Sequence, residues 1–294
     1  MNEITISKNT AILKAKAFFE LTKFRLSITV VFSSLFGYAI AIQEFSVLKL
    51  VLFALAGYAT TASANVINQL IEINLDKLMK RTQSRPLPSG RITQTEAKIF
   101  SVVLGIFSIL VLGTIFNYKA ALLALASVIL YGFIYTPLKR VGPVAVAVGA
   151  LPGAFPPMIG WVAATGHFGL EPGILFAIQF FWQFPHFWAI AWVLDEDYKK
   201  AGFKLLPSSG EKNINTAFQM MIYTLFLIPL CWVPFYLEMT GLNSAVIAML
   251  CGLLFLAQTF HLMRKVNDKA ALQLMFGSFL YLPIVQLSYL FDKL

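Results

Sequence analysis

The chain contains few charged residues and very few cysteines and histidines. Asp, Glu, Lys and Arg make up 13% of its 294 residues, about half the share typical of a soluble globular domain, which excludes an ordinary soluble fold. The two cysteines, Cys231 and Cys251, fall inside apolar stretches and are better read as packing residues than as a disulfide or metal pair. The 3 histidines form no pair at metal-binding spacing, and no glycine-rich phosphate loop is followed by Lys-Ser or Lys-Thr. These absences argue against a thiolate or imidazole metal centre and a P-loop nucleotide site.

The N-terminus also lacks the arrangement of a signal or transit peptide. Lys14 and Lys16 interrupt any apolar core before residue 26, and Glu3 and Glu20 fit poorly with an acid-poor transit peptide. We expect residues 1–25 to form a cytoplasmic amphipathic segment lying on the membrane surface. The missing transit peptide favours a bacterial inner (plasma) membrane.

Long apolar runs, in contrast, dominate the sequence. Hydrophobic residues make up 58% of the chain, in runs of about 20 residues without period-2 alternation, as expected of membrane-spanning helices rather than barrel strands. The fold class is therefore all-α, a single polytopic membrane domain over 1–294 with nine transmembrane helices. The predicted spans are 26–43, 48–68, 99–116, 120–136, 143–163, 173–194, 216–236, 244–262 and 271–290.

Basic residues follow this plan closely. With a cytoplasmic N-terminus, only Lys49, Lys119 and Lys293 of the 23 Lys and Arg residues face the outside, which leaves 20 inside. The positive-inside rule requires such a bias, so the C-terminus is expected outside and the loops 69–98 and 195–215 in the cytoplasm. The net charge of +9 is thus explained by topology, and we expect no nucleic-acid partner.

The first of these loops and the end of the preceding span carry the most informative polar residues. Asn68, Glu72 and Asp76 are four residues apart, so on a helix they lie one above another, with Asn65 on the same side. Carboxylate and amide oxygens suit Mg²⁺, which tends to bind through a few carboxylates together with substrate phosphates. The cations that follow, Lys80, Arg81 and Arg85, could bind the phosphate oxygens. Beside apolar helices, this set describes a lipid diphosphate site.

A second polar stretch, residues 195–210, has a similar order of acidic, basic and Pro/Ser/Gly residues at the end of span 6. The similarity indicates two related halves of four spans with the ninth appended. Tyr135 and Lys139 return to the same face at the end of span 4. Alone they are better explained as an aromatic belt with a topological anchor, and their place on the same face as the acidic residues raises the functional alternative.

Two spans have unusual interiors. Span 5 contains several prolines and glycines, and either a kinked wall around a bulky ligand or a kink filled by neighbouring side chains would explain them. Span 6 places His186 and Gln183 beside Pro185 at mid-membrane depth, where a functional role and a packing role both stay open. Lys23 and Arg25, before span 1, are expected to be topology anchors rather than ligands.

Five segments in order resemble the UbiA-type intramembrane prenyltransferases, and among them the branch that farnesylates protohaem IX. Asn68-x-x-x-Glu72-x-x-x-Asp76 resembles the first aspartate-rich motif of the family. The finer resemblance rests on MKRTQSRPLPSGR (79–91), YTPLKR (135–140), GALPGAFPPMIGW (149–161), WQFPHFW (182–188) and DYKKAGFKLLP (197–207).

The resemblance implies transfer of a farnesyl group from farnesyl diphosphate to the vinyl group of haem b, giving haem O for terminal oxidases. It implies Mg²⁺ as cofactor, an active site towards the cytoplasmic face, and a haem A synthase or terminal oxidase as a partner. By the same resemblance, the catalytic residues would be Asn68, Glu72, Asp76 and Asp197, and the metal ligands Asn68, Glu72, Asp76, Asp195 and Asp197. The diphosphate would contact Asn65, Lys80, Arg81, Arg85, Tyr135, Lys139 and Lys199, and His186 is the candidate haem contact.

The sequence departs from the family pattern at two motifs. Glu72 stands where many relatives have Asp, and the second motif lacks a regular Asp-x-x-x-Asp because position 201 is Ala, which leaves open which of Asp195, Glu196 and Asp197 binds metal. Two alternatives also stay open. One is a UbiA-type enzyme with an aromatic or quinone-precursor acceptor, and the other is a secondary transporter, which would place charged groups near mid-membrane.

Overall fold

The structure is a computed structural model that describes residues 3–208 and 210–294, with side chains described from residue 11 onward. Among these residues there are sixteen helices and no β-strand, apart from one isolated bridge between Thr240 and Lys293. Nine helical segments are long and apolar enough to cross a membrane. The prediction of an all-α protein with nine membrane helices is therefore confirmed.

Each segment overlaps its predicted span, and the ends differ by a few residues. The segments are α2 (Phe24–Ala41), α3 (Val47–Ile71), α5 with η1 (Gln94–Val111, Leu112–Phe116), α6 with η2 and α7 (Tyr118–Ile129, Leu130–Tyr135, Thr136–Leu138), α8 (Val144–Thr165), α9 (Leu170–Val193), α11 with α12 (Ile214–Leu230, Val233–Tyr236), α13 (Leu242–Lys265) and α14 (Asp268–Phe291). Both η elements are π-helical, which the apolar pattern of spans 3 and 4 did not indicate.

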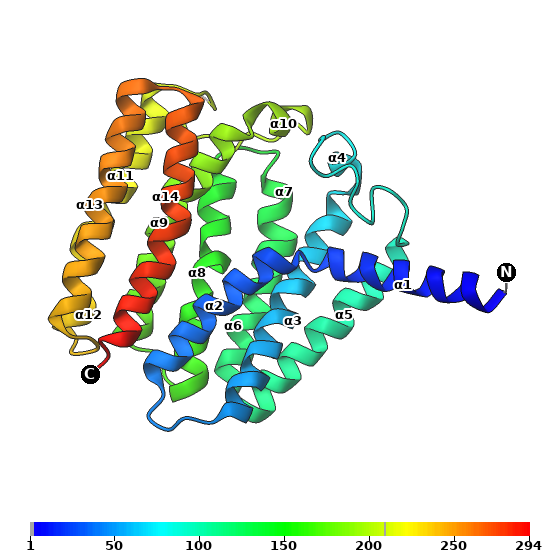
Figure 1. Cartoon of the computed structure of the whole chain (residues 1–294), viewed down its shortest axis with the longest axis horizontal. Coiled ribbons are helices and arrows are strands. Elements are labelled where there is room, and N and C mark those ends of the chain that lie inside the picture. Colours follow the sequence, from blue (N-terminus) through cyan, green and yellow to red (C-terminus); the bar gives the residue numbers. More distant parts are fainter. Residues whose placement is uncertain (1–2, 209) are drawn as a thin grey trace.

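The central helices of the bundle are α2, α8, α9 and α14 (Figure 1). On one side, α3, α5 and α6 pack together against α2 and α8; on the other, α11 and α13 pack against α9 and α14. Two short helices, α4 (Ile73–Asp76) and α10 (Asp195–Lys200), lie at one end of the bundle, opposite the end where the chain terminates, and α1 (Glu3–Leu21) extends from the side of the bundle (Figure 1). We call the end with α4 and α10 the site face.

Helix α8 remains continuous despite three internal prolines, because its neighbours pack closely around them. Pro157 has no N–H to donate to the carbonyl of Gly153, and the side chain of Gln179 on α9 donates to that carbonyl instead, at 2.8 Å. Gly37 on α2 leaves room for Pro157, since a Cβ there would lie 2.0 Å from the Pro157 oxygen. The prolines of span 5 are thus packed by neighbouring helices, and only the beginning of α8 reaches the site.

Helix α1 covers most of the N-terminal segment, and its position on a membrane surface stays a prediction. Ala17 and Leu21 are buried against α3 and the loop before α5, whereas Ile12 and Phe19 are exposed. Residues 1–2 of the predicted segment lie outside the described residues. Helix α1 turns into α2 through only Thr22 and Lys23, which brings Lys23 to the site face.

Candidate active site

A cavity of about 650 Å³ opens at the site face. Its apolar wall comes from α2, α8 and α9, and includes Phe24, Leu26, Val146, Phe187 and Ile190. Its polar wall comes from the α1–α2 turn, the end of α3, α4 with the following loop, η2 and α7. The cavity thus places an apolar surface beside a charged one, as an amphiphilic substrate would require.

The acidic part of the polar wall is formed where α3 ends. Asn68 lies in the last turns of α3, Glu72 follows the helix with φ −95° and ψ 9°, and the short α4 ends at Asp76. Asn68 Nδ2 donates to Glu72 Oε2 at 2.9 Å, and the Asp76 N–H donates to the Glu72 carbonyl at 2.7 Å. All three side chains are buried. The predicted four-residue spacing therefore brings them to one wall, although the long helix itself stops at Ile71.

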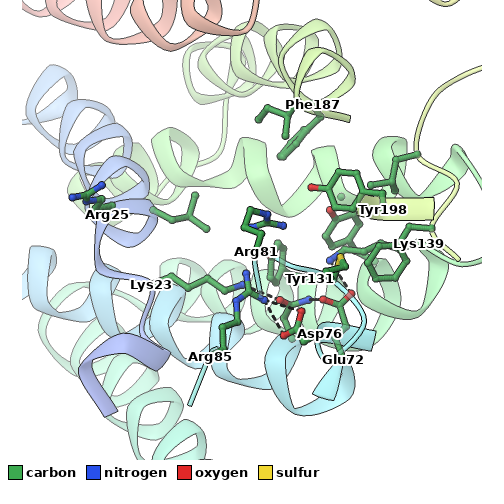
Figure 2. Close-up of a pocket in the computed structure, with 18 of the residues that line it drawn as sticks. Lys23, Arg25, Glu72, Asp76, Arg81, Arg85, Tyr131, Lys139, Phe187 and Tyr198 are labelled. Carbon is green, nitrogen blue, oxygen red and sulfur yellow. Dashed lines mark hydrogen bonds and ion pairs between the residues drawn. The ribbon is translucent and has the colours of Figure 1, made fainter. Parts of the chain in front are cut away.

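Each of these acidic or amide groups has a cationic partner from another element (Figure 2). Arg85 Nη1 contacts both carboxylate oxygens of Asp76, at 3.0 and 2.9 Å, and Lys139 Nζ contacts Glu72 Oε1 at 2.9 Å. Lys23 Nζ donates to Asn68 Oδ1 at 2.9 Å. Buried carboxylates require such partners, because an unpaired charge out of water is costly.

The polar wall nevertheless carries an excess of positive charge. Arg25 and Arg81 also line the cavity, so five cations, Lys23, Arg25, Arg81, Arg85 and Lys139, stand against three carboxylates, Glu20, Glu72 and Asp76. Burial, followed by the charges of Arg85 and Lys139, lowers the pKa of Lys23 to about 7. An anion bound here would relieve this crowding of cations.

Two tyrosines stand above the charged groups. The π-helix η2 carries Tyr131 and Tyr135 to the cavity, with their ring centroids 5.2 Å apart. Gly149 on α8 leaves room for Tyr135, because a Cβ there would lie 2.6 Å from the ring. Lys139 Nζ lies 4.8 Å from the Tyr135 ring centroid. Single π-helical turns occur frequently at functional sites, and this one places aromatic faces between the charged and apolar walls.

Seven of the residues predicted for the site line this cavity together. They are Asn68, Glu72, Asp76, Arg81, Arg85, Tyr135 and Lys139. The cavity has the elements of a diphosphate site: carboxylate and amide oxygens suited to a hard cation, and Arg and Lys groups suited to phosphate oxygens.

The second predicted acidic cluster is not part of this wall. Asp195 on α10 pairs with Lys199 at 2.7 Å, and the side chain of Lys199 is 61% exposed. Asp197 accepts a hydrogen bond from the Lys80 N–H at 3.1 Å and lines a separate, more open cavity together with Lys80. Of the residues on α10, Tyr198 reaches the main cavity. The structure therefore does not bring Lys80, Asp195, Asp197 and Lys199 to Glu72 and Asp76, and their roles as ligands stay predictions.

Asn65 is buried beside the α1–α2 turn and does not line the cavity. Its Nδ2 donates to the Thr22 carbonyl at 3.3 Å and to Ser27 Oγ at 3.2 Å. Its position three residues before Asn68 correctly predicted that Asn65 lies near the acidic wall, but it did not indicate the contacts with Thr22 and Ser27. The structure gives Asn65 contacts to the turn that carries Lys23, and its contact with a diphosphate stays a prediction.

His186 also lies outside the residues that line the cavity. Its Nδ1 lies 2.8 Å from Ser278 Oγ on α14, and its ring stacks on Trp182 with centroids 4.5 Å apart. The next residue, Phe187, does line the cavity. The structure thus gives His186 a packed, hydrogen-bonded place between α9 and α14, and contact with a haem stays a prediction.

Sequence reasoning missed four residues of this region. Lys23 and Arg25 were interpreted as topology anchors rather than ligands, yet both line the cavity. Tyr131 was not distinguished from other belt aromatics, and Gln69 was not considered. Tyr131 lies four residues before Tyr135, and that spacing could have indicated it. For Lys23 the sequence contains no comparable signal, because its place depends on the left-handed turn between α1 and α2.

Comparisons with known proteins agree with this geometry. The sequence model of the UbiA prenyltransferase family matches residues 30–282. A protoheme IX farnesyltransferase from Cytophaga hutchinsonii is 56% identical over 280 residues, which cover 95% of this chain and 98% of that protein. Another protein of that name, from Flavobacterium psychrophilum, is 46% identical over 284 residues, covering 94% of each chain.

Solved structures share the fold at low sequence identity. A digeranylgeranylglyceryl phosphate synthase superposes with a TM-score of 0.80 at 23% identity, covering 95% of this chain and 98% of that one. A UbiA homologue from Archaeoglobus fulgidus bound to GPP and Mg²⁺ superposes with a TM-score of 0.64 at 19% identity, covering 93% and 99%.

Proposed function

Because this chain belongs to the UbiA prenyltransferase family, we propose that it transfers a farnesyl group from farnesyl diphosphate to the vinyl group of haem b, giving haem O and diphosphate. The acceptor is supported by the relatives named protoheme IX farnesyltransferase, at up to 56% identity over nearly the full chain. The prenyl donor is supported by the cavity itself. Its cationic wall suits a diphosphate, and its apolar wall suits an isoprenoid tail.

The observation that carries the proposal is the pairing of Glu72 and Asp76 with Lys139 and Arg85 at one end of an apolar cavity. These are groups that can exchange partners when a diphosphate enters. The phosphate oxygens would take the Arg and Lys donors, and the freed carboxylates would face a cation. Lys23 precedes α2, Glu72 and Asp76 follow α3, and Lys139 follows α7, so the charges lie at the ends of membrane helices rather than at their middle. This position favours a diphosphate-using enzyme over a transporter.

The residues present fit a Mg²⁺ ion. Asn68, Glu72 and Asp76 offer an amide oxygen and two carboxylates on one wall, and Mg²⁺ is typically held by one or two carboxylates plus substrate phosphates. Within 3–208 and 210–294 no group of three or more His, Cys, Asp or Glu converges, so the two carboxylates would need substrate phosphates to complete the ligands of the ion. When bound, the ion would neutralise charge on the diphosphate as a Lewis acid. Mg²⁺ is present in the related structure from Archaeoglobus fulgidus.

The chain's own groups would act mainly by holding the leaving diphosphate. Negative charge grows on the bridging oxygen as the allylic C1–O bond breaks, and Arg85, Lys139 and Lys23 are placed to stabilise it. The rings of Tyr131 and Tyr135 would keep water from the developing cation at C1. The vinyl group of the acceptor then forms the new bond to C1, and water adds to the resulting cation and releases a proton, which leaves a hydroxyl group. No side-chain nucleophile is required.

The site face is proposed to lie towards the cytoplasm of a bacterial inner membrane. The cations Lys139, Arg140, Lys199 and Lys200 lie at this end, whereas Lys49, Lys119 and Lys293 lie near the other. Farnesyl diphosphate, which has a charged diphosphate head and an apolar isoprenoid tail, would then enter from the cytoplasmic leaflet. The haem O product would pass to an enzyme that oxidises or inserts haem, such as a haem A synthase or a terminal oxidase.

The test is turnover by the purified protein. Haem b and farnesyl diphosphate are incubated with Mg²⁺ or with EDTA, and 4-hydroxybenzoate replaces haem in a parallel reaction. We expect farnesylated haem and released diphosphate in the reaction with Mg²⁺ but not in the reaction with EDTA. We expect no prenylated benzoate in either. Asp76→Asn should lose at least a hundredfold in turnover, whereas Glu171→Gln, a carboxylate at the opposite end of the bundle, should be unaffected. Haem left unmodified by the wild-type protein would refute the proposal.

A further inference from the structure

The turn between α1 and α2 holds a lysine in a strained backbone conformation. Lys23 has φ 51° and ψ 56°, the left-handed region that residues other than glycine rarely adopt. Its side chain nevertheless reaches the polar wall of the cavity, 2.9 Å from Asn68 Oδ1. Strain of this kind persists only where the surrounding structure fixes it, and it gathers at functional sites.

Two buried carboxamides on α3 are among the groups that hold this turn, together with the hydroxyls of Ser27 and Tyr58, which bond Thr22. Gln69, which is 1% exposed, donates from Nε2 to the Leu21 carbonyl at 2.8 Å and to the Asn65 carbonyl at 3.1 Å. Asn65 donates to the Thr22 carbonyl at 3.3 Å. The two residues before Lys23 are thus both tied to α3. Leu21 is at the C-terminal end of α1, where carbonyls have no partner within the helix.

The same stretch of α3 carries both the groups that hold the turn and the groups that line the cavity. Asn65 and Gln69 contact the turn, while Asn68 and Glu72 line the cavity. Helix α3 therefore fixes the distance between the Lys23 backbone and the acidic cluster. A shift of the turn would move the Lys23 ammonium relative to Asn68.

We propose that Gln69, assisted by Asn65, is a positioning residue for prenyl diphosphate binding: it holds the α1–α2 turn so that the Lys23 ammonium meets the diphosphate. Gln69 touches neither the cavity nor the substrate, and it acts through Lys23. The inference rests on the proposed function only in requiring a prenyl diphosphate as substrate, and it is independent of the acceptor.

A role in folding alone makes a different prediction. If Gln69 merely pins α1 to the bundle, removing its carboxamide lowers thermal stability and leaves substrate affinity unchanged, or weakens affinity independently of Lys23. If it positions Lys23, its effect on affinity disappears once the Lys23 ammonium is gone. A double-mutant cycle separates these two cases.

The experiment measures the Kd of farnesyl thiolodiphosphate, an unreactive analogue, with Mg²⁺ and without haem. The variants are Gln69→Leu, Lys23→Met and the double variant. The control is Ser63→Ala, which also removes a donor on α3 that bonds a neighbouring helix, to the Ser101 carbonyl at 2.8 Å, away from the turn. We expect about tenfold weaker binding for each single variant, the loss of one charge-assisted contact. The double variant should bind no more weakly than Lys23→Met, and Ser63→Ala should stay within about twofold of the wild type.

Several results would overturn the inference. Wild-type affinity in Gln69→Leu would do so, and so would losses that multiply to about a hundredfold in the double variant. If Gln69→Leu cannot be purified folded, Gln69→Asn replaces it, since the shorter side chain keeps a carboxamide that cannot reach the Leu21 carbonyl. A wild-type protein that binds the analogue but leaves haem unmodified refutes the acceptor and leaves this inference standing. A wild-type protein that does not bind the analogue refutes both.

Discussion

The ion pair between Glu72 and Lys139 allows a quantitative test of how the polar wall is built. The side chains of the two residues are 5% and 11% exposed, and their charged atoms lie 2.9 Å apart. Lys139→Met removes the cation but keeps a side chain of similar length, so Glu72 would be left in the wall without its partner. Asn68 would then be its remaining hydrogen-bond donor.

Removing one partner of a buried ion pair typically costs about 3–5 kcal/mol. Because this pair borders a cavity that water can enter, we expect the lower end, about 3 kcal/mol. At about 2–4 °C per kcal/mol for a chain of this size class, the apparent Tm should fall by roughly 6–12 °C. The double variant Lys139→Met/Glu72→Gln removes both charges, and it should recover to within about 1 kcal/mol of the wild type.

Thermal unfolding in one detergent, followed by circular dichroism, measures this series. Turnover is measured on the same samples below the transition, where both variants should have lost at least tenfold in kcat/KM, since each lacks a group placed for the diphosphate. A double variant as unstable as Lys139→Met would refute the reasoning, because the cost would then come from lost packing rather than from an unpaired charge.

Three further predictions concern individual contacts. Arg85→Lys keeps the charge but loses the contact with both oxygens of Asp76, so it should lower kcat/KM about tenfold, and Arg85→Ala should lower it further. Equal activity of Arg85→Lys and the wild type would contradict this. Gly149→Ala places a Cβ against the Tyr135 ring, so it should raise the KM for farnesyl diphosphate several-fold with little change in the KM for haem. The control is Gly173→Ala, at a glycine with open space around it. Gln179→Leu leaves the Gly153 carbonyl without a donor and breaks the hydrogen bond with Ser33. It should cost about 1–3 kcal/mol of stability, while the kinetic constants at low temperature stay unchanged. An unshifted unfolding transition would show that this network is dispensable.

The parts of the fold that follow from composition and periodicity could be predicted from the sequence. Long apolar runs predicted nine membrane helices because the bilayer requires backbone hydrogen bonds within each span. The four-residue spacing of Asn68, Glu72 and Asp76 predicted one shared wall, and the structure brings them there even though α3 ends between them. Tyr135 and Lys139 were placed on the same face, and they do line the cavity.

What could not be predicted depends on contacts between distant segments. Lys23 reaches the cavity through a left-handed turn held by Asn65 and Gln69, and no local pattern indicates that turn. The resemblance implies that Asp195 and Asp197 bind metal, which stays a prediction; on α10 they contact Lys199, Lys200 and the Lys80 backbone. Their direction is set by how α10 packs, which the order of charges along the chain does not specify.

The central claim is that the cavity beneath Tyr135 is the diphosphate site, and an electron cryomicroscopy map with bound ligand tests it most directly. The protein would be imaged with Mg²⁺ and farnesyl thiolodiphosphate. The account predicts density for the diphosphate among Lys23, Arg85 and Lys139, with the tail along Phe24 and Leu26. Diphosphate density in the separate cavity beside Lys80 and Asp197, with the wall of Glu72 and Asp76 unchanged, would contradict it.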